Sequence, residues 1–397
     1  MIENTHRLNS ISPSCTNNSD LQFLKEKIKD ADLVLLGEAG HLDGSTFEAK
    51  TRIIKFLNQQ MGFEVLVFES GLYDCFKAWN LYEQGVGYDS AFGRGVFPVW
   101  STSRQLDYLK TYIARSIETG HRMELAGCDI QFTGSIGPQK RGDEFNEDLQ
   151  RLFPDVSIPE YSMLVDIISD NNKYFRHVSI NDFDTVSRKI VKSQLQSLIK
   201  KLEDVKPKSL RQLFFLRYLK NIDKNLYFKW NLDFNNLDAE VANSRDREMA
   251  RNLIWLKDTV YKHKKLIVWG ATSHLISNRS FLQNEDKMIS MGSYIKKHYG
   301  QRCYIIGFSS FDGILGSISR NESYRVPMAS NKSIEYLLNQ SGIQYGFLDK
   351  RAFACMGDIF IARFLGYSNY SAKWNEMLDA MLFINEMKPN TAKDETK

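Results

Sequence analysis

Short apolar runs of strand length alternate with helix-spaced apolar stripes along this 397-residue chain. The runs fall at residues 33–37, 64–69, 122–129 and, much later, 266–270. Apolar residues recur at helical spacing before the first run (Leu21, Leu24 and Ile28), between the first and second (Phe47, Ile54 and Leu57), and between the second and third (Leu106, Leu109, Ile113 and Ile117). Strand and helix in alternation, with short connections, predict a mostly parallel sheet flanked by helices, which is an α/β fold.

The middle of the chain has a different pattern. From residue 138 to residue 261 the sequence is long, charged and of helical period, and it lacks clear strand signals. We therefore predict a single domain over residues 1–397, with a large helical insertion at 138–261 that covers the strand ends. Alternation then resumes, and we expect disorder only in the first few residues and in the polar tail from Pro389.

Each of four apolar runs ends in an ionisable residue or is soon followed by one. Glu38 and His41 follow the first run, Glu69 ends the second, Asp129 ends the third, and His274 follows the fourth. Ligands of open parallel sheets bind beyond the carboxyl ends of the strands, so these side chains are candidates for one shared site. Polar residues also mark places where buried strands reach the surface, and that explanation covers any one of the four taken alone.

Composition excludes several classes of protein. The net charge of +4 comes from 52 basic and 48 acidic residues, a balance that does not indicate nucleic-acid binding. The five cysteines are scattered and show no Cys-x-x-Cys spacing, so neither a disulfide framework nor a zinc cluster is indicated. The sequence has neither a signal-peptide pattern at its start nor an apolar run of membrane-spanning length. We expect a cytoplasmic protein that acts on a small molecule and uses neither cofactor nor metal.

The order of the motifs resembles that of the erythromycin esterase family. The motifs that carry the resemblance are Gly37-Glu-Ala-Gly-His41, Phe47-Glu-Ala-Lys-Thr-Arg-Ile-Ile-Lys-Phe-Leu57, Gly62-Phe-Glu-Val-Leu-Val-Phe-Glu69, Trp100-Ser-Thr, Gly127-Cys-Asp129, Ser244-Arg-Asp-Arg-Glu-Met-Ala-Arg-Asn252, Val268-Trp-Gly-Ala-Thr-Ser-His274, Met291-Gly-Ser-Tyr-Ile-Lys-Lys, Ile306-Gly-Phe and Asp379-Ala-Met-Leu-Phe-Ile384. The resemblance implies an α/β fold with a helical insertion and metal-free hydrolysis of an ester or lactone, such as the macrolactone of macrolide antibiotics.

The resemblance also implies roles for individual residues. His41 would be the general base that activates water, Glu38 and Glu69 would orient that water and tune the imidazole, and His274 would lie across the cleft. An imidazole with a pKa near 6.5 is a competent base at neutral pH, and a carboxylate partner selects its tautomer. The expected substrate-binding residues are Lys50, Trp100, Asp129 and Arg245. Lys50 or His274 could donate a hydrogen bond to the oxyanion.

Some positions depart from the family pattern or allow a second interpretation. Ala271 and Thr272 replace a second histidine and an asparagine, and Asp43-Gly44-Ser45 replaces a Thr-Arg-Glu sequence. Arg245 and Asp246 could form an ion pair at a helix end instead of orienting the site.

Two alternative functions also stay open. Two histidines with two glutamates could ligate a cation in a metal-dependent hydrolase. A protein that has lost one catalytic imidazole could bind its ligand without turning it over.

Overall fold

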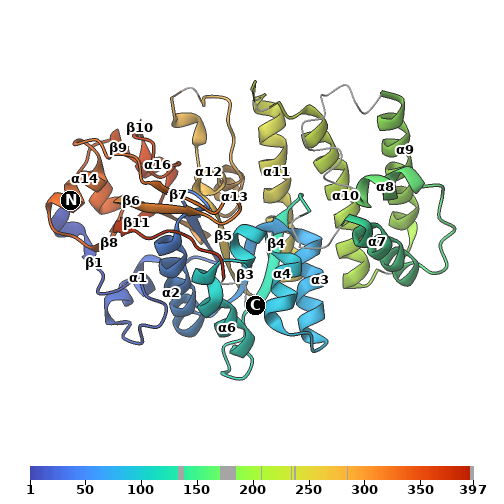
Figure 1. The fold of residues 1–397 in the computed structure, drawn as a ribbon, viewed down its shortest axis with the longest axis horizontal. Coiled ribbons are helices and arrows are strands. Elements are labelled where there is room, and N and C mark those ends of the chain that lie inside the picture. Colours follow the sequence, from blue (N-terminus) through green and yellow to red (C-terminus); the bar gives the residue numbers. More distant parts are fainter. Residues whose placement is uncertain are drawn as a thin grey trace.

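The apolar runs form neighbouring strands of one sheet (Figure 1). The computed structural model describes residues 1–393 apart from 133–137, 170–184, 207, 234, 237 and 284. The strands are β1 (His6–Arg7), β2 (Leu33–Glu38), β3 (Phe63–Gly71), β4 (Glu124–Asp129), β5 (Lys265–Ala271), β6 (Cys303–Ser317), β7 (Glu322–Arg325), β8 (Tyr345–Asp349), β9 (Phe360–Ala362), β10 (Tyr370–Ala372) and β11 (Ala380–Met387). The sheet has the order β1-β8-β11-β6-β2-β5-β3-β4, with β7 paired to β6, while β9 and β10 pair separately.

The centre of this sheet is parallel. From β11 to β4 every neighbouring pair runs parallel, and β8 and β1 add antiparallel pairing at one edge. The helices are α1 (Leu24–Lys27), α2 (Gly44–Met61), α3 (Leu72–Glu83), α4 (Tyr88–Gly95), α5 (Pro98–Ser101), α6 (Asp107–Arg115), α7 (Pro138–Leu152), α8 (Ser162–Ser169), α9 (Thr185–Asp204), α10 (Leu210–Asn231), α11 (Ala239–Trp255), α12 (Thr272–Leu275), α13 (Met291–Tyr299), α14 (Ile334–Gln340), α15 (Lys350–Ala354) and α16 (Trp374–Met377). The predicted α/β fold with a mostly parallel sheet is confirmed.

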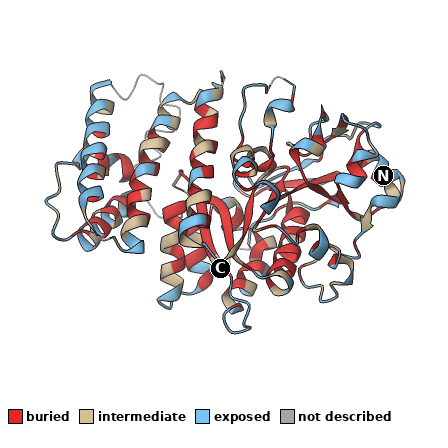
Figure 2. Cartoon of the chain, turned by 180° about the vertical axis from the view of Figure 1, so that it is seen from behind, coloured by how far each residue is buried: buried red, intermediate tan, exposed pale blue. Residues whose placement is uncertain are grey.

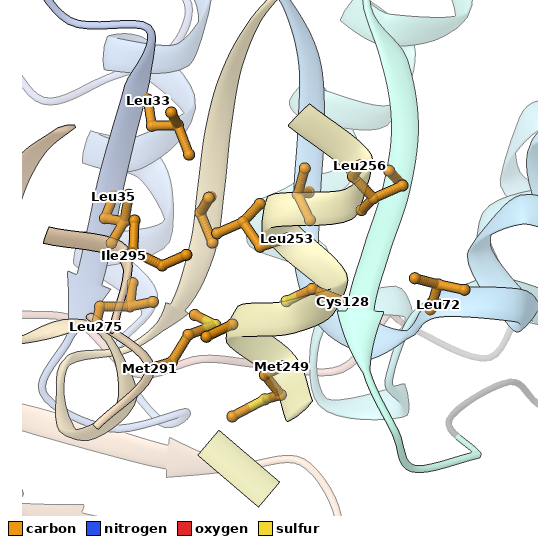
Figure 3. Close-up of a cluster of buried hydrophobic side chains, with 14 of the residues drawn as sticks. Leu33, Leu35, Leu72, Cys128, Met249, Leu253, Leu256, Leu275, Met291 and Ile295 are labelled. Carbon is orange, nitrogen blue, oxygen red and sulfur yellow. The ribbon is translucent and has the colours of Figure 1, made fainter. Parts of the chain in front are cut away.

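Both faces of the sheet are buried, which explains why its strands are continuous apolar runs. In β2, Leu33 and Leu35 belong to one hydrophobic cluster, and Val34 and Leu36 belong to the other. Figure 3 shows the first cluster, in which Leu253 of α11 lies over the central strands. In Figure 2 the buried residues follow the strands and the helix faces turned toward them.

Helices α7 to α11 follow β4 and precede β5 in the chain. α7 to α10 lie to one side of the sheet, whereas α11 lies against it next to β4 (Figure 1). The boundary of the helical insertion at residues 138 and 261 stays a prediction. Among the described residues, no helix combines the length and the apolar character needed to span a membrane.

The structure corrects two expectations about the ends of the chain. The tail from Pro389 is ordered as far as residue 393, because Pro389 bridges Asp43 and Ala392 bridges Ser103. The start is also ordered, since β1 pairs with β8. These segments are polar, so the apolar pattern carried no signal for the backbone pairing that orders them.

Candidate active site

Four adjacent strands bring their ionisable residues to one edge of the sheet. Glu38 is the last residue of β2, Asp129 is the last of β4, and Glu69 lies two residues before the end of β3. His274 lies in α12, directly after β5. Glu38 pairs in register with Ala271 at the end of β5. The chain therefore places these residues together through the parallel alignment of its strands.

A first group of contacts, the His41 cluster, consists of Glu38, His41, Lys50 and Trp100. His41 Nδ1 lies 2.7 Å from Glu38 Oε1, and the Trp100 indole nitrogen donates to the same oxygen at 3.0 Å. Lys50 Nζ donates to Glu38 Oε2 at 2.5 Å. A carboxylate only accepts, so the His41 proton lies on Nδ1 and the neutral ring offers the lone pair of Nε2. No described residue forms a hydrogen bond with that nitrogen.

Burial and charge act in opposite directions on His41 and Lys50. Burial disfavours protonation of His41, but the hydrogen bond and charge of Glu38 outweigh it and raise the pKa of His41 above 6.5. For Lys50, burial outweighs the attraction of Glu38 and lowers the pKa of the ammonium. Lys50 lies 4.5 Å from the centre of the Trp269 ring, which adds a cation–π contact.

A second group of contacts, the His274 cluster, consists of Glu69, Asp129, Arg245, Asp246 and His274. Arg245 donates to Asp129 through Nε at 3.2 Å and through Nη2 at 2.7 Å, and Nη2 also donates to Glu69 Oε1 at 3.0 Å. His274 Nδ1 lies 2.9 and 3.0 Å from the two Asp246 oxygens. The His274 Nε2 atom lies 3.1 Å from Arg245 Nη1. One guanidinium thus joins residues from three elements.

The charged residues of this cluster stabilise one another's ionised forms. Burial disfavours the ionised form of Glu69, but the charges of His274 and Arg245 outweigh it and lower the pKa of Glu69 to about 2. Burial also disfavours protonation of His274, and Asp246 and Glu69 outweigh it and raise the pKa of His274 above 6.5. Burial alone would lower the pKa of Arg245, yet Asp129 and Glu69 raise it.

Gly270 separates the two clusters. Lys50 donates to the Gly270 carbonyl at 3.2 Å, and the next residue, Ala271, donates its N–H to Glu69 Oε2 at 2.8 Å. A Cβ atom at position 270 would lie 2.9 Å from Glu69 Oε2, closer than a side chain tolerates. A side chain at position 270 would therefore force the Glu69 carboxylate to move from its place beside the Ala271 N–H.

Exposure divides the predicted site residues into two sets. The side chain of His41 is 40% exposed, that of His274 is 17% exposed and that of Arg245 is 12% exposed. The other predicted site residues are buried: Glu38, Lys50, Glu69, Trp100 and Asp129. Their predicted roles in binding or catalysis stay predictions. Each of them contacts one of the three accessible residues or another buried member of the set.

The structure also shows contacts that the sequence did not indicate. The alternative of an Arg245–Asp246 ion pair at a helix end is wrong, because both residues lie inside α11 and each pairs with a different strand or helix. Asp43 is buried and accepts from the Gly40 N–H at 3.1 Å, and burial raises its pKa to about 7. Asn390 donates to the His41 carbonyl at 3.3 Å. Spacing gave no signal for this contact from the far end of the chain.

Lysine and arginine side chains place fixed positive charge in the site. In the described part of the chain, no three His, Cys, Asp or Glu side chains are arranged to share a metal ion. Lys50 lies between Glu38 and the Gly270 carbonyl, and Arg245 lies between Glu69 and Asp129. Each carboxylate that could have ligated a metal thus has a fixed basic partner.

The family model of erythromycin esterase matches residues 58–387. The chain belongs to the erythromycin esterase family. The match covers the His274 cluster and begins after Lys50, so most of the His41 cluster lies outside it. The chain is 26% identical over 416 residues to "Putative hydrolase YbfO" of Bacillus subtilis (strain 168), covering 96% of this chain and 89% of that protein.

Three solved structures share the fold of this erythromycin esterase family member. A Bacillus cereus protein is 19% identical with a TM-score of 0.79, covering 99% of this chain and 97% of its own. A succinoglycan biosynthesis protein is 17% identical with a TM-score of 0.76, and the match covers 98% of this chain and 96% of that protein. A mutant of the erythromycin esterase EreC in its open conformation is 15% identical with a TM-score of 0.76, and the match covers 97% of this chain and 98% of that protein.

Proposed function

We propose that this protein is a hydrolase in which His41 activates a water molecule for attack on an ester or lactone carbonyl. The observation that carries the proposal is the 2.7 Å contact between His41 Nδ1 and Glu38 Oε1 on an imidazole that is 40% exposed. This contact directs the Nε2 lone pair of neutral His41 away from Glu38, and Nε2 has no partner among the described residues.

The reaction needs one base and one site for negative charge. His41 Nε2 takes a proton from water, the water oxygen bonds to the carbonyl carbon, and the carbonyl π electrons move to the oxygen. The C=O bond then re-forms, the bond to the leaving oxygen breaks, and His41 returns its proton to that oxygen. Atoms and charge balance without a metal or a cofactor.

The buried residues support this chemistry by holding the base in place. Trp100 and Lys50 fix both oxygens of Glu38, at 3.0 and 2.5 Å, so the carboxylate cannot turn away from His41. Asn390 holds the backbone of His41 from the other side. We assign positioning roles to Glu38, Lys50 and Trp100, because their burial leaves them no surface for a substrate.

We place the substrate among small molecules that carry an ester or a lactone, with macrolides as one class to test. One structural neighbour, the erythromycin esterase EreC, bears the name of a macrolide. We further propose a cytoplasmic location, since the five cysteines are all free thiols.

Ala271 favours a second candidate function. Its methyl group occupies the position where the family pattern has a histidine, so a ligand could bind between the clusters without being hydrolysed. A ligand that stabilises the protein against heat and is recovered unchanged would support this binding function.

The test compares ester hydrolysis by the wild type, His41→Ala and His298→Ala. His298 is the matched control, because it also pairs with a carboxylate, Asp258 at 3.1 Å, and its side chain is 46% exposed. Purified protein is incubated with aryl esters and macrolides, with and without a chelator, and products are followed by mass spectrometry. We expect His41→Ala to lose about 10²–10⁴-fold in rate, with no loss in His298→Ala or with chelator.

Each other outcome changes the conclusion. Hydrolysis that survives in His41→Ala refutes the role of His41. Loss of activity on chelation supports the metal-dependent alternative, and the absence of turnover together with ligand-induced stabilisation supports the binding alternative.

A further inference from the structure

Two side chains compete for one nitrogen atom of His274. Its Nε2 atom lies 3.1 Å from Arg245 Nη1 and 3.4 Å from Glu69 Oε1. A guanidinium nitrogen only donates hydrogen bonds, and an ionised carboxylate only accepts them. His274 Nε2 can therefore pair with Arg245 only when it carries no proton, and with Glu69 only when it carries one.

The other ring nitrogen has a constant partner. His274 Nδ1 lies within 3.0 Å of both Asp246 oxygens, and the Met291 N–H donates to Asp246 Oδ1 at 2.8 Å. Since a carboxylate only accepts, Nδ1 carries a proton whether the ring is neutral or charged. Any change in protonation of His274 consequently falls on Nε2, the atom that faces Arg245.

Arg245 responds to this change through one of its three nitrogens. Nε and Nη2 are held by Asp129 and Glu69, whereas among the described residues Nη1 has His274 Nε2 as its acceptor. When Nε2 takes a proton, it turns its N–H toward Glu69 and Nη1 loses that acceptor. The Arg245 side chain is 12% exposed, whereas that of Asp129 is fully buried, so Arg245 is the member of this pair that has accessible surface.

We propose that Arg245 Nη1 donates the hydrogen bond that stabilises the ester oxyanion, and that His274 controls this donor. Neutral His274 accepts the hydrogen bond of Nη1 and occupies it, and protonated His274 releases Nη1 to the substrate oxygen. The inference rests on the proposed function. As the water oxygen bonds to the carbonyl carbon and the π electrons move to oxygen, the released N–H donates to that oxygen.

The proposal requires two different protonation states at once. His41 must be neutral to accept a proton from water, and His274 must be protonated to release Arg245. The charged groups acting on His274 are Asp246 and Arg245 from α11 and Glu69 from β3. Around them, Glu38 and Asp129 end the strands β2 and β4, Arg279 donates to the Ser273 carbonyl, and α13 contributes the Met291 N–H. The pH profile of kcat/KM is therefore bell-shaped, with its alkaline limb set by His274.

Two variants separate this control from simple structural support. In Arg245→Gln the donor is gone, so kcat falls by about 10²–10³-fold and the alkaline limb disappears. In Asp246→Asn the amide can donate to His274 Nδ1 while its oxygen still accepts from Met291. Neutral His274 then carries its proton on Nε2 and points it at Glu69, which releases Arg245 at every pH.

Asp246→Asn is thus expected to lose the alkaline limb while retaining a kcat about 10-fold or more above that of Arg245→Gln. Arg247→Gln is the control on the same helix, since Arg247 pairs with Glu240 at 3.0 Å, away from both clusters. It keeps the bell-shaped profile of the wild type. A merely structural role of Arg245 would lower the rate and leave the alkaline limb in place.

¹⁵N NMR of the His274 ring gives a readout that does not depend on activity. At pH values above the titration of His274, we expect the ring proton on Nδ1 in the wild type and on Nε2 in Asp246→Asn. This measurement does not use Arg245→Gln, so it tests the inference even if that variant does not fold. If the wild type hydrolyses an ester but its neutral His274 carries the proton on Nε2, this inference is overturned and the proposed function is not. An alkaline limb that is unchanged in Asp246→Asn has the same meaning. A wild type that hydrolyses no ester refutes the proposed function and the oxyanion role together.

Discussion

Lys50→Met tests whether the candidate site is held together by a buried ion pair. Lys50 and Glu38 are both 0% exposed, and 2.5 Å separates Lys50 Nζ from Glu38 Oε2. Methionine has a similar length and keeps the contact with the Trp269 ring, so the substitution removes charge with little change in volume. What it leaves behind is a carboxylate buried without its cation.

The burial of both partners sets the size of the expected effect. Removing one partner of a buried pair costs about 3–5 kcal/mol in the free energy of unfolding, because the other charge is left uncompensated. His41 and Trp100 still donate to Glu38 Oε1, which places the expected loss at about 3 kcal/mol, the lower end of this range. The Lys220–Glu203 pair, 49% and 47% exposed, is the control, and Lys220→Met should cost about 0–1 kcal/mol.

The assay is denaturant unfolding at pH 7, with the midpoint and slope compared among the variants. Lys50→Met combined with Glu38→Gln should be more stable than Lys50→Met alone, since the uncompensated charge is then gone. A loss below about 1 kcal/mol in Lys50→Met would refute the reasoning, because it would place the pair in the range of exposed ion pairs.

Three further predictions concern charge and space in the site. Glu38→Gln removes the charge that raises the pKa of His41, so an NMR titration should show that pKa falling and the acid limb of kcat/KM moving to lower pH; an unchanged titration contradicts this. The pKa of Glu69 is lowered from 4.5 to about 2, so its stabilisation is complete above pH 4.5 and is lost as the pH falls toward 2. Glu69→Gln should therefore cost about 2 kcal/mol more at pH 7 than at pH 3, and an equal cost at both pH values in urea unfolding would disprove it. Gly270→Ala places a Cβ 2.9 Å from Glu69 Oε2, so its thermal midpoint should fall, whereas Gly87→Ala, with open space around its Cβ and a negative φ of -53°, is the control for adding a methyl group without a clash.

Much of the fold could be predicted because the strands are buried on both faces. The run at 33–37 became β2 (Leu33–Glu38) and the run at 266–270 became β5 (Lys265–Ala271). The strand β8 (Tyr345–Asp349) was not predicted, since it is short and lies near the antiparallel edge of the sheet. Helix α1 (Leu24–Lys27) is a single turn, although its apolar spacing extended over a longer stretch.

The position of the candidate site could be predicted from the sequence, but the hydrogen bonds and ion pairs within the site were harder to predict. Strand-end placement pointed to Glu38, Glu69 and Asp129, because parallel strands bring their carboxyl ends to one edge. The pairing of His274 with Asp246, a residue of α11, could not be predicted from the spacing of residues along the sequence. A helix can present either of two neighbouring residues to a partner, and packing against the sheet decides which.

The amino-acid sequence by itself determined which segments are buried strands and which ionisable residues follow them, since apolar periodicity and chain order are local properties. Only the tertiary structure decided that these residues divide into two clusters around Gly270. Lys50 meets a carbonyl 220 positions away, and Arg245 meets a carboxylate 116 positions away. Hydrogen bonds act over about 3 Å, and the packing of helices on the sheet sets which distant groups come within that distance.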